Sequence, residues 1–518
     1  MNLKIRDIIF FLLCFCLSFY YIPEPIQIKF IGGVIGDKLV FYPLILGFFY
    51  TFYYQYKYKN IFINFNVFKK FVLVYLLVNF ISVIIGLYSY PYYDLILNGP
   101  INNVEKLQKV IAIFKDYHIT FDEKTLTMLW IISRPIKSSL TEIVYTFGGA
   151  YMIYCWYYKN WQEGFRILIL GVLASFTVIF SYSLIELFYL AGNAKAKNIL
   201  EFITPYFHII KADGTWWPLL LWNTQLRSIF PEPAYYGTYF SFAMPILWYV
   251  AVKEKNLVKN TFLYLAIVFF TFCLFLTQAR TAFALFIGEI AIFILFLVNF
   301  SQKNLLKKSF AILICSMLAF GFANYYISNI LTDNKFEIKT SSEYVKNNLT
   351  SLVGTEQRSN NSRYSIMIAD LKIGLDHPFF GIGKELRNAY LPDYLPEISK
   401  NNPEVNMWLK NQKEKGILSS GFPKLGEYTS RFSETGLLGL IMFLFPPFFL
   451  LKNLYNKFVD QNILIKDKLL VAFYTISFVG IMASGIGDSI NTTYCYWVLL
   501  GIGYAMCCEK INNNNFKK

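Results

Sequence analysis

Arginines beside apolar segments are the residues of this chain best suited to bind an anion. Arg280, in QARTAFALFIGE, stands where two apolar runs meet in a short hairpin. An arginine near membrane depth is costly, so it usually faces a partner or a polar cavity, and its planar fork suits phosphate or carboxylate oxygens. The alternative is a guanidinium that reaches out to lipid headgroups.

Other arginines are expected on the same side of the molecule as Arg280, in the loops and at the segment ends. These are Arg227, Arg358, Arg363, Arg387 and Arg431. Preorganised guanidinium groups could hold a diphosphate without a metal and stabilise charge on a leaving pyrophosphate. Loops also carry solvated arginines, so Arg358, Arg387 and Arg431 could each be ordinary surface residues.

Two glutamates occupy positions where a carboxylate is unusual. Glu232 lies between two prolines in RSIFPEPAYYG, at the start of an apolar run, and could act as a general base. Burial would raise its pKa and a neighbouring arginine would lower it. The alternative is a carboxylate that faces the positive end of the following helix. Glu289 falls inside an apolar run, and we expect it to serve packing or gating.

The stretch from Arg363 to Gly383 predicts a helix followed by a fixed turn. Tyr364, Ile368, Leu371 and Leu375 recur at helical spacing and form an apolar stripe, away from the face that carries Arg363. Asp376-His377-Pro378 ends the helix, because proline cannot continue it. Gly381 and Gly383 permit a tight turn.

The composition identifies an integral membrane protein. Of 518 residues, 56% are hydrophobic and only 16% are charged, and the apolar runs are long enough to span a bilayer as helices. The eight cysteines and three histidines show no metal-ligand spacing, so we expect no metal and no cofactor. The net charge of +15 does not require nucleic acid as a partner, because much of it lies in short loops.

Twelve apolar segments predict an all-α polytopic fold. They reach to about residue 22 and then cover about 38–54, 70–90, 141–158, 166–192, 233–252, 260–279, 281–300, 308–330, 431–451, 467–486 and 491–508. Lysines and arginines gather in alternate short loops, which predicts cytoplasmic N- and C-termini. Spans one to nine then occupy 1–330 with external loops at about 91–140 and 193–232. A large, partly helical external loop at 331–430 precedes spans ten to twelve (431–510) and a disordered cytoplasmic tail (511–518).

Short motifs in a fixed order resemble the bacterial O-antigen polymerase and ligase superfamily. RYSIMIADLKIGLDHPFFGIG and the later EYTSRFSETGLLGLIMFLF resemble the C-terminal signature of that family. QARTAFALFIGE resembles its arginine-containing segment, and FPEPAYYGTY an earlier motif. The resemblance implies a metal-independent glycosyltransferase of the GT-C type, in the bacterial inner membrane, that acts outside on glycans carried by undecaprenyl diphosphate.

Within this resemblance, Arg280 and Arg363 would contact the diphosphate, and Arg227 and Arg387 are further candidates. The family's ligases carry a His-Asn pair where this sequence has Leu425-Gly426, which favours a polymerase of oligosaccharide repeat units for a surface polysaccharide such as O-antigen or capsule. The departure leaves the base open among four candidates. They are Glu232, Glu427, Asp376 and His377, of which His377 is favoured as structural because it belongs to the turn.

Aromatic side chains near these residues are candidates for stacking on sugar rings: Tyr235, Tyr236, Trp216 and Trp217. The expected partners are a lipid-linked oligosaccharide and membrane lipid, with a chain-length regulator and a flippase as further candidates. Two alternatives stay open. One is a ligase that transfers the glycan to lipid A core or another acceptor, and the other is a flippase for lipid-linked oligosaccharides. A flippase needs a cavity open to either side, whereas the polar residues here concentrate in three loops on one side.

Overall fold

The fold was analysed in a computed structural model, which describes residues 4–23, 26–28, 38–59, 62, 65–118, 122–208, 219–222, 224–298, 300, 302–331, 358–419 and 421–507. All regular secondary structure in these residues is helical. The predicted tail at 511–518, residues 332–357 and 420 of the 331–430 loop, Trp216 and Trp217 lie outside the described residues.

Helices coincide with all twelve predicted spans. In chain order they are α1 (Ile5–Cys16), α3 (Phe41–Tyr58), α4 (Phe65–Tyr88), the continuous run of α8 (Ser133–Ile143), η2 (Val144–Gly148) and α9 (Gly149–Tyr157), then α10 (Trp161–Leu190), α12 (Pro233–Lys253), α13 (Leu257–Leu276), α14 (Arg280–Leu297), α15 (Lys303–Asn329), α20 (Glu427–Val459), α21 (Ile465–Ser484) and α22 (Tyr494–Cys507). Among the described residues, seven helices are long and apolar enough to cross a membrane: α4, α10, α13, α14, α15, α20 and α21. The all-helical polytopic fold is therefore confirmed, and twelve spans remain the predicted number.

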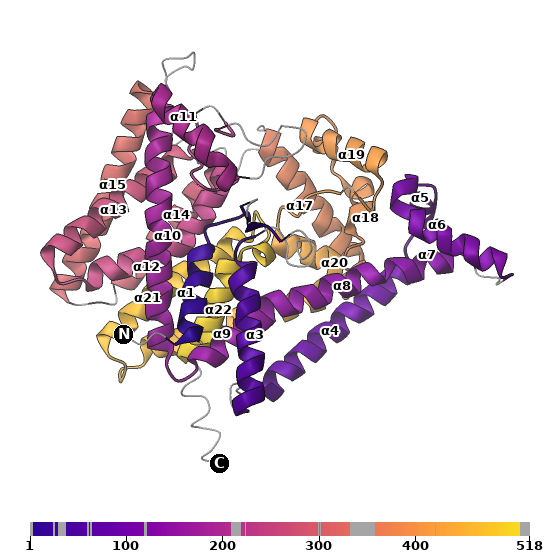
Figure 1. Ribbon diagram of the computed structural model, residues 1–518, viewed down its shortest axis with the longest axis horizontal. Coiled ribbons are helices and arrows are strands. Elements are labelled where there is room, and N and C mark those ends of the chain that lie inside the picture. Colours follow the sequence, from indigo (N-terminus) through magenta and orange to yellow (C-terminus); the bar gives the residue numbers. More distant parts are fainter. Residues whose placement is uncertain are drawn as a thin grey trace.

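Shorter helices fill the three predicted external loops. They are α5 (Tyr93–Leu97), α6 (Ile101–Asp116), α7 (Glu123–Ile131), α11 (Ala194–Ile203), η3 (Thr204–Tyr206), α17 (Arg358–Asp376), α18 (Arg387–Tyr394), η4 (Glu397–Ser399) and α19 (Pro403–Lys415). Figure 1 shows α5 to α7 at the far end of an arm formed by α4 and α8, with α17, α18 and α19 grouped beside that arm.

Two separate hydrophobic cores hold these parts together. The larger core is built by the apolar bundle. The smaller one joins the first and third predicted external loops, through residues such as Leu107 of α6 and Ile373 of α17. The rings of Tyr90 and Tyr390 meet edge to face with centroids 5.9 Å apart across this junction. Segments nearly 300 residues apart in the chain thus form one packed unit beside the bundle.

The turn after α17 is locked into a break in α20. Gly436 interrupts α20 with φ of 64°, where a Cβ atom would lie 2.4 Å from the carbonyl carbon of Phe379. Next to this break, the amide of Leu437 donates to the oxygen of Pro378 over 2.7 Å, and the amide of Gly383 donates to the oxygen of Glu434 over 2.9 Å. The predicted end of the helix at Asp376 and the turn that follows are confirmed, with positive φ at Gly381 and Gly383.

Candidate active site

Arg280 and Arg363 come from different helices and lie within electrostatic range of each other. Arg280 is the first residue of α14, at the tight connection that follows α13. Arg363 projects from α17, where its Nη1 donates a 2.7 Å hydrogen bond to the oxygen of Gly487. The two guanidinium charges act on each other, and the hydroxyl of Tyr364 acts on Arg280. Two half-buried cations within electrostatic range of each other are suited to a ligand with more than one negative charge.

Glu232 lies beside this arginine pair. It is the N-cap residue of α12, in an extended conformation, and its side chain makes no capping hydrogen bond. Burial raises the pKa of Glu232, the charge of Arg363 opposes that rise, and the carboxylates Asp488 and Glu404 reinforce it. The prolines on either side fix the backbone, and Pro233 starts the helix. A carboxylate with a raised pKa within electrostatic range of Arg363 is suited to general-base chemistry.

Asp488 is a second carboxylate at the same place, on the short connection between α21 and η5 (Ile490–Thr492). Burial raises the pKa of Asp488, while the amide of Ser489 and the charges of Arg363 and Lys38 lower it in that order. Nζ of Lys38 lies 4.7 Å from the ring centroid of Tyr20. Three cations therefore gather with two carboxylates where α12, α14 and α17 face the connection before α22. The cations are Arg280, Arg363 and Lys38, and the carboxylates are Glu232 and Asp488.

Tyr235 is the one described aromatic candidate that belongs to this group. Its ring lies 4.8 Å, centroid to centroid, from that of Tyr20, and it is in electrostatic range of Asp488 and Glu232. Tyr236, one residue on, is buried in the bundle instead. Its hydroxyl donates to the oxygen of Phe270 over 3.1 Å, which is a packing role rather than a sugar-binding one.

Arg387 and Arg227 do not join the pair. Arg387 is 1% exposed and holds both carboxylate oxygens of Asp370, with contacts of 2.5 and 2.8 Å. Arg227 is fully buried, its amide donates to Glu186, and its Nη1 donates to the oxygen of Pro231 over 3.3 Å. Both fit structural roles: Arg387 ties α18 to α17, and Arg227 shapes the chain that leads to Glu232.

Glu427 and Arg431 belong to a buried ionic network under the site. Arg431 bonds to Glu427 over 2.5 Å, to the hydroxyl of Tyr75 over 2.8 Å and to Glu142, which also binds Lys384. The other oxygen of Glu427 accepts a 2.8 Å hydrogen bond from Ser489. These contacts fasten α20 to α4, α8 and the connection that carries Asp488. A carboxylate with both oxygens engaged is poorly placed to take a proton from a substrate.

The remaining candidates lie apart from the arginine pair or are not described. Asp376 is exposed and accepts a 2.8 Å hydrogen bond from Tyr394. The amide of His377 extends the end of α17, and its ring lies edge-on to that of Tyr390 at 6.2 Å. Glu289 is buried in α14, where it accepts a hydrogen bond from Ser241. The side chain of Arg358 is outside the described part of the chain.

Sequence reasoning missed Asp488, Lys38 and Tyr20. Asp488 stands in a connection too short to draw notice as a functional loop, and Lys38 sits at the predicted edge of a span, where lysines are common. The one available signal was a carboxylate in a Gly-rich turn, GIGDS, between two apolar runs.

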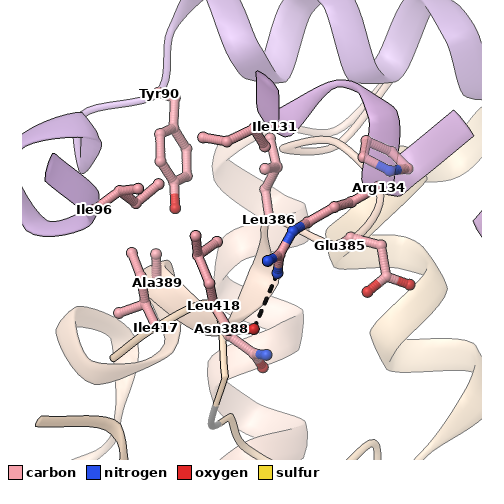
Figure 2. A pocket seen from close by; sticks show the side chains of 11 residues that line it. Tyr90, Ile96, Ile131, Arg134, Glu385, Leu386, Asn388, Ala389, Ile417 and Leu418 are labelled. Atoms are coloured by element: carbon pink, nitrogen blue, oxygen red, sulfur yellow. Dashed lines mark hydrogen bonds between the residues drawn. The ribbon is translucent and has the colours of Figure 1, made fainter. Parts of the chain in front are cut away.

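Figure 2 shows a pocket that lies away from these residues, where α5, α7 and α8 meet α18 and the chain after α19. Arg134 points across it and donates from Nη1 to the oxygen of Leu418 over 3.0 Å. Glu385, also in its lining, accepts a 2.8 Å hydrogen bond from Ser138. The hydrogen bonds of Arg134 and Glu385 thus join the two walls of the pocket. Much of the remaining lining is apolar and includes Ile96, Ile131 and Leu418.

Residues 265–411 match the model of a protein family described as O-antigen ligase. In that region the chain is similar to O-antigen ligases. The resemblance to the O-antigen polymerase and ligase superfamily is thereby confirmed, and no curated protein matches the chain. The matched region includes Arg280, Arg363 and the turn after α17, whereas Glu232 and Asp488 lie outside its bounds. The match and the apolar helices indicate a multi-pass membrane protein with a function of the O-antigen ligase or polymerase type.

Proposed function

We propose that the chain is a polymerase that joins oligosaccharide repeat units carried on undecaprenyl diphosphate, at the outer face of the bacterial inner membrane. The observation that carries the proposal is that Arg363 lies within electrostatic range of both Arg280 and Glu232. Two fixed guanidinium groups match a diphosphate, and a carboxylate with a raised pKa matches a sugar hydroxyl that must lose its proton.

In the proposed reaction, a hydroxyl oxygen of the acceptor glycan attacks the anomeric carbon of the donor glycan. A new glycosidic C–O bond forms as the bond from that carbon to the diphosphate oxygen breaks. The proton of the hydroxyl passes to the carboxylate of Glu232, and undecaprenyl diphosphate leaves with both electrons of the broken bond. Arg280 and Arg363 stabilise the charge that develops on the leaving oxygens, as preorganised donors do in other enzymes.

Asp488 and Lys38 would position this machinery. Asp488 balances part of the charge of Arg363 and Lys38, which keeps three cations together before the substrate arrives. Tyr235 offers an aromatic face next to Glu232, suited to a sugar ring of the donor or acceptor.

The second candidate is a ligase, because the matched family bears that description. The residues Leu425 and Gly426 stand where the resemblance places the ligase's His-Asn pair, and this favours the polymerase.

An experiment with two acceptors separates the candidates. The protein in liposomes receives lipid-linked repeat units, with or without lipid A core. The polymerase proposal expects a ladder of lengthened lipid-linked glycans in both cases. Transfer of single glycans to lipid A core, with no ladder, would establish the ligase instead. Deletion of the chain in its host should reduce the surface glycan to one repeat unit.

A further inference from the structure

The outer face of α17 carries an apolar stripe that the described residues of the protein leave exposed. Ile368, Leu371 and Leu375 are 37%, 43% and 69% exposed, although their spacing is that of a packing face. The opposite side of the helix, with Ile366 and Ile373, fills the second core. A row of exposed apolar side chains on a helix that is otherwise well packed indicates contact with something apolar.

At one end, this stripe continues toward a helix that is apolar enough to cross a membrane. Phe379, 66% exposed, lies in the turn that follows the end of α17 at Asp376. The backbone of Phe379 accepts a 3.2 Å hydrogen bond from the amide of Leu438, in α20. Beyond that point α20 is apolar enough to cross a membrane, and its Ile441 and Phe445 are 50% and 57% exposed. The apolar surface is therefore continuous from α20 to α17.

At its other end, the stripe comes within electrostatic range of Arg280. Tyr364 lies one turn before Ile368 on the same side of α17, and its hydroxyl acts on the charge of Arg280. Tyr364 and Leu375 are eleven positions apart, which corresponds to about 16 Å at the rise of an α-helix. A ligand with a diphosphate head and a long hydrocarbon chain matches both ends of this surface.

We propose that the stripe of Ile368, Leu371, Leu375 and Phe379 holds the isoprenoid chain of the lipid diphosphate substrate where it leaves the bilayer. The proposal rests on the proposed function, because it takes the diphosphate to be bound at Arg280 and Arg363. The stripe would keep the first isoprene units in contact with apolar side chains while the diphosphate head group is bound at Arg280 and Arg363. It would also make the enzyme select for long-chain carriers, since a short chain cannot reach along the helix.

The test compares two donor substrates with the same glycan and diphosphate, one on a full-length isoprenoid and one on a chain of two isoprene units. For the double variant Leu371→Ser with Leu375→Ser, KM for the long-chain donor should rise about tenfold or more, because two apolar contacts are lost. KM for the short-chain donor and kcat for both should stay unchanged. The variant Leu371→Met with Leu375→Met should keep the wild-type KM.

The matched control is Ile398→Ser with Met407→Ser. Both side chains are exposed apolar residues of the same part of the chain, 45% and 50% exposed, and neither belongs to the stripe. A photoreactive residue at Leu375 gives a second readout that does not need the serine variants. It should label the long-chain donor, and excess unlabelled long-chain donor should compete.

Equal changes in KM for both donors, or none, would overturn the proposal, and so would labelling of bulk phospholipid alone. A failure of the proposed function looks different, because the wild-type protein would then give no lengthened glycan from either donor.

Discussion

Arg363 holds the oxygen of Gly487 with a 2.7 Å hydrogen bond from Nη1, so a helix of the large loop is tied to the connection before α22. The next residue along that connection is Asp488, whose carboxylate interacts electrostatically with Arg363. One guanidinium nitrogen is thus used to fix the position of the side chain. The fork can still offer its other N–H groups to a ligand.

Replacing Arg363 by lysine should reduce turnover about 100-fold, because lysine keeps the charge but loses the fork that can bind Gly487 and an anion together. Alanine should reduce it further. The measurement is the initial rate of glycan lengthening by protein in liposomes. Arg166→Ala is the matched control, because Arg166 pairs with Glu163 on the surface of α10, and its rate should equal that of the wild type. Equal rates for Arg363→Lys and wild type would remove Arg363 from the site.

Replacing Glu232 by glutamine should lower turnover about 100-fold or more, the usual cost of losing a general base. The base must be deprotonated, so the wild-type rate should rise with pH through the pKa of Glu232. Burial places that pKa above the ordinary glutamate value of about 4.3. The acid limb of the pH profile of kcat/KM should therefore lie above that value and disappear in Glu232→Gln.

Glu254→Gln provides the control at the other end of α12, where Glu254 is the C-cap residue. It should leave both the rate and the profile unchanged. An acid limb that persists in Glu232→Gln would point to another base, with Asp488 as the first to test.

The sequence predicted the helices well because a membrane span needs about twenty apolar residues. Lipid allows only helices or closed barrels to cross it. It predicted the arginines from motif order and from the cost of charge near a membrane. The sequence did not point to Asp488, because Arg363, with which it interacts electrostatically, lies 125 residues earlier. No local sequence pattern indicates an interaction over that separation. Arg387 and Glu427 look like site residues in the sequence, and only the packing shows that Asp370 and Arg431 engage them.

The break at Gly436 should not tolerate a side chain. Gly436→Ala places a Cβ atom against the backbone of Phe379 at a positive φ, so the hydrogen bonds between α20 and the turn after α17 should weaken. We expect a loss of about 1–3 kcal/mol of stability, seen as a lower midpoint of thermal unfolding in detergent. Gly321→Ala is the control, since its Cβ would meet nothing within 4 Å in a regular helix. A midpoint unchanged in Gly436→Ala would contradict the proposed strain.

Removing Arg431 should destabilise the protein by about 3–5 kcal/mol, because Glu142 and Glu427 are then left with uncompensated buried charge. Arg431→Met keeps much of the volume and isolates the loss of charge. The measurement is denaturant unfolding in detergent, with Lys109→Met as a control at an exposed pair worth at most about 1 kcal/mol. Similar stability of the two variants would show that the network is not a structural anchor.

The most direct test of the arginine site uses purified protein in liposomes with lipid-linked repeat units as the only glycan. The account predicts a ladder of lengthened glycans from the wild type and from Arg166→Ala, and single repeat units from Arg280→Ala with Arg363→Ala. Both variant proteins should keep wild-type helix content and thermal midpoint. A normal ladder from the double variant would contradict the account.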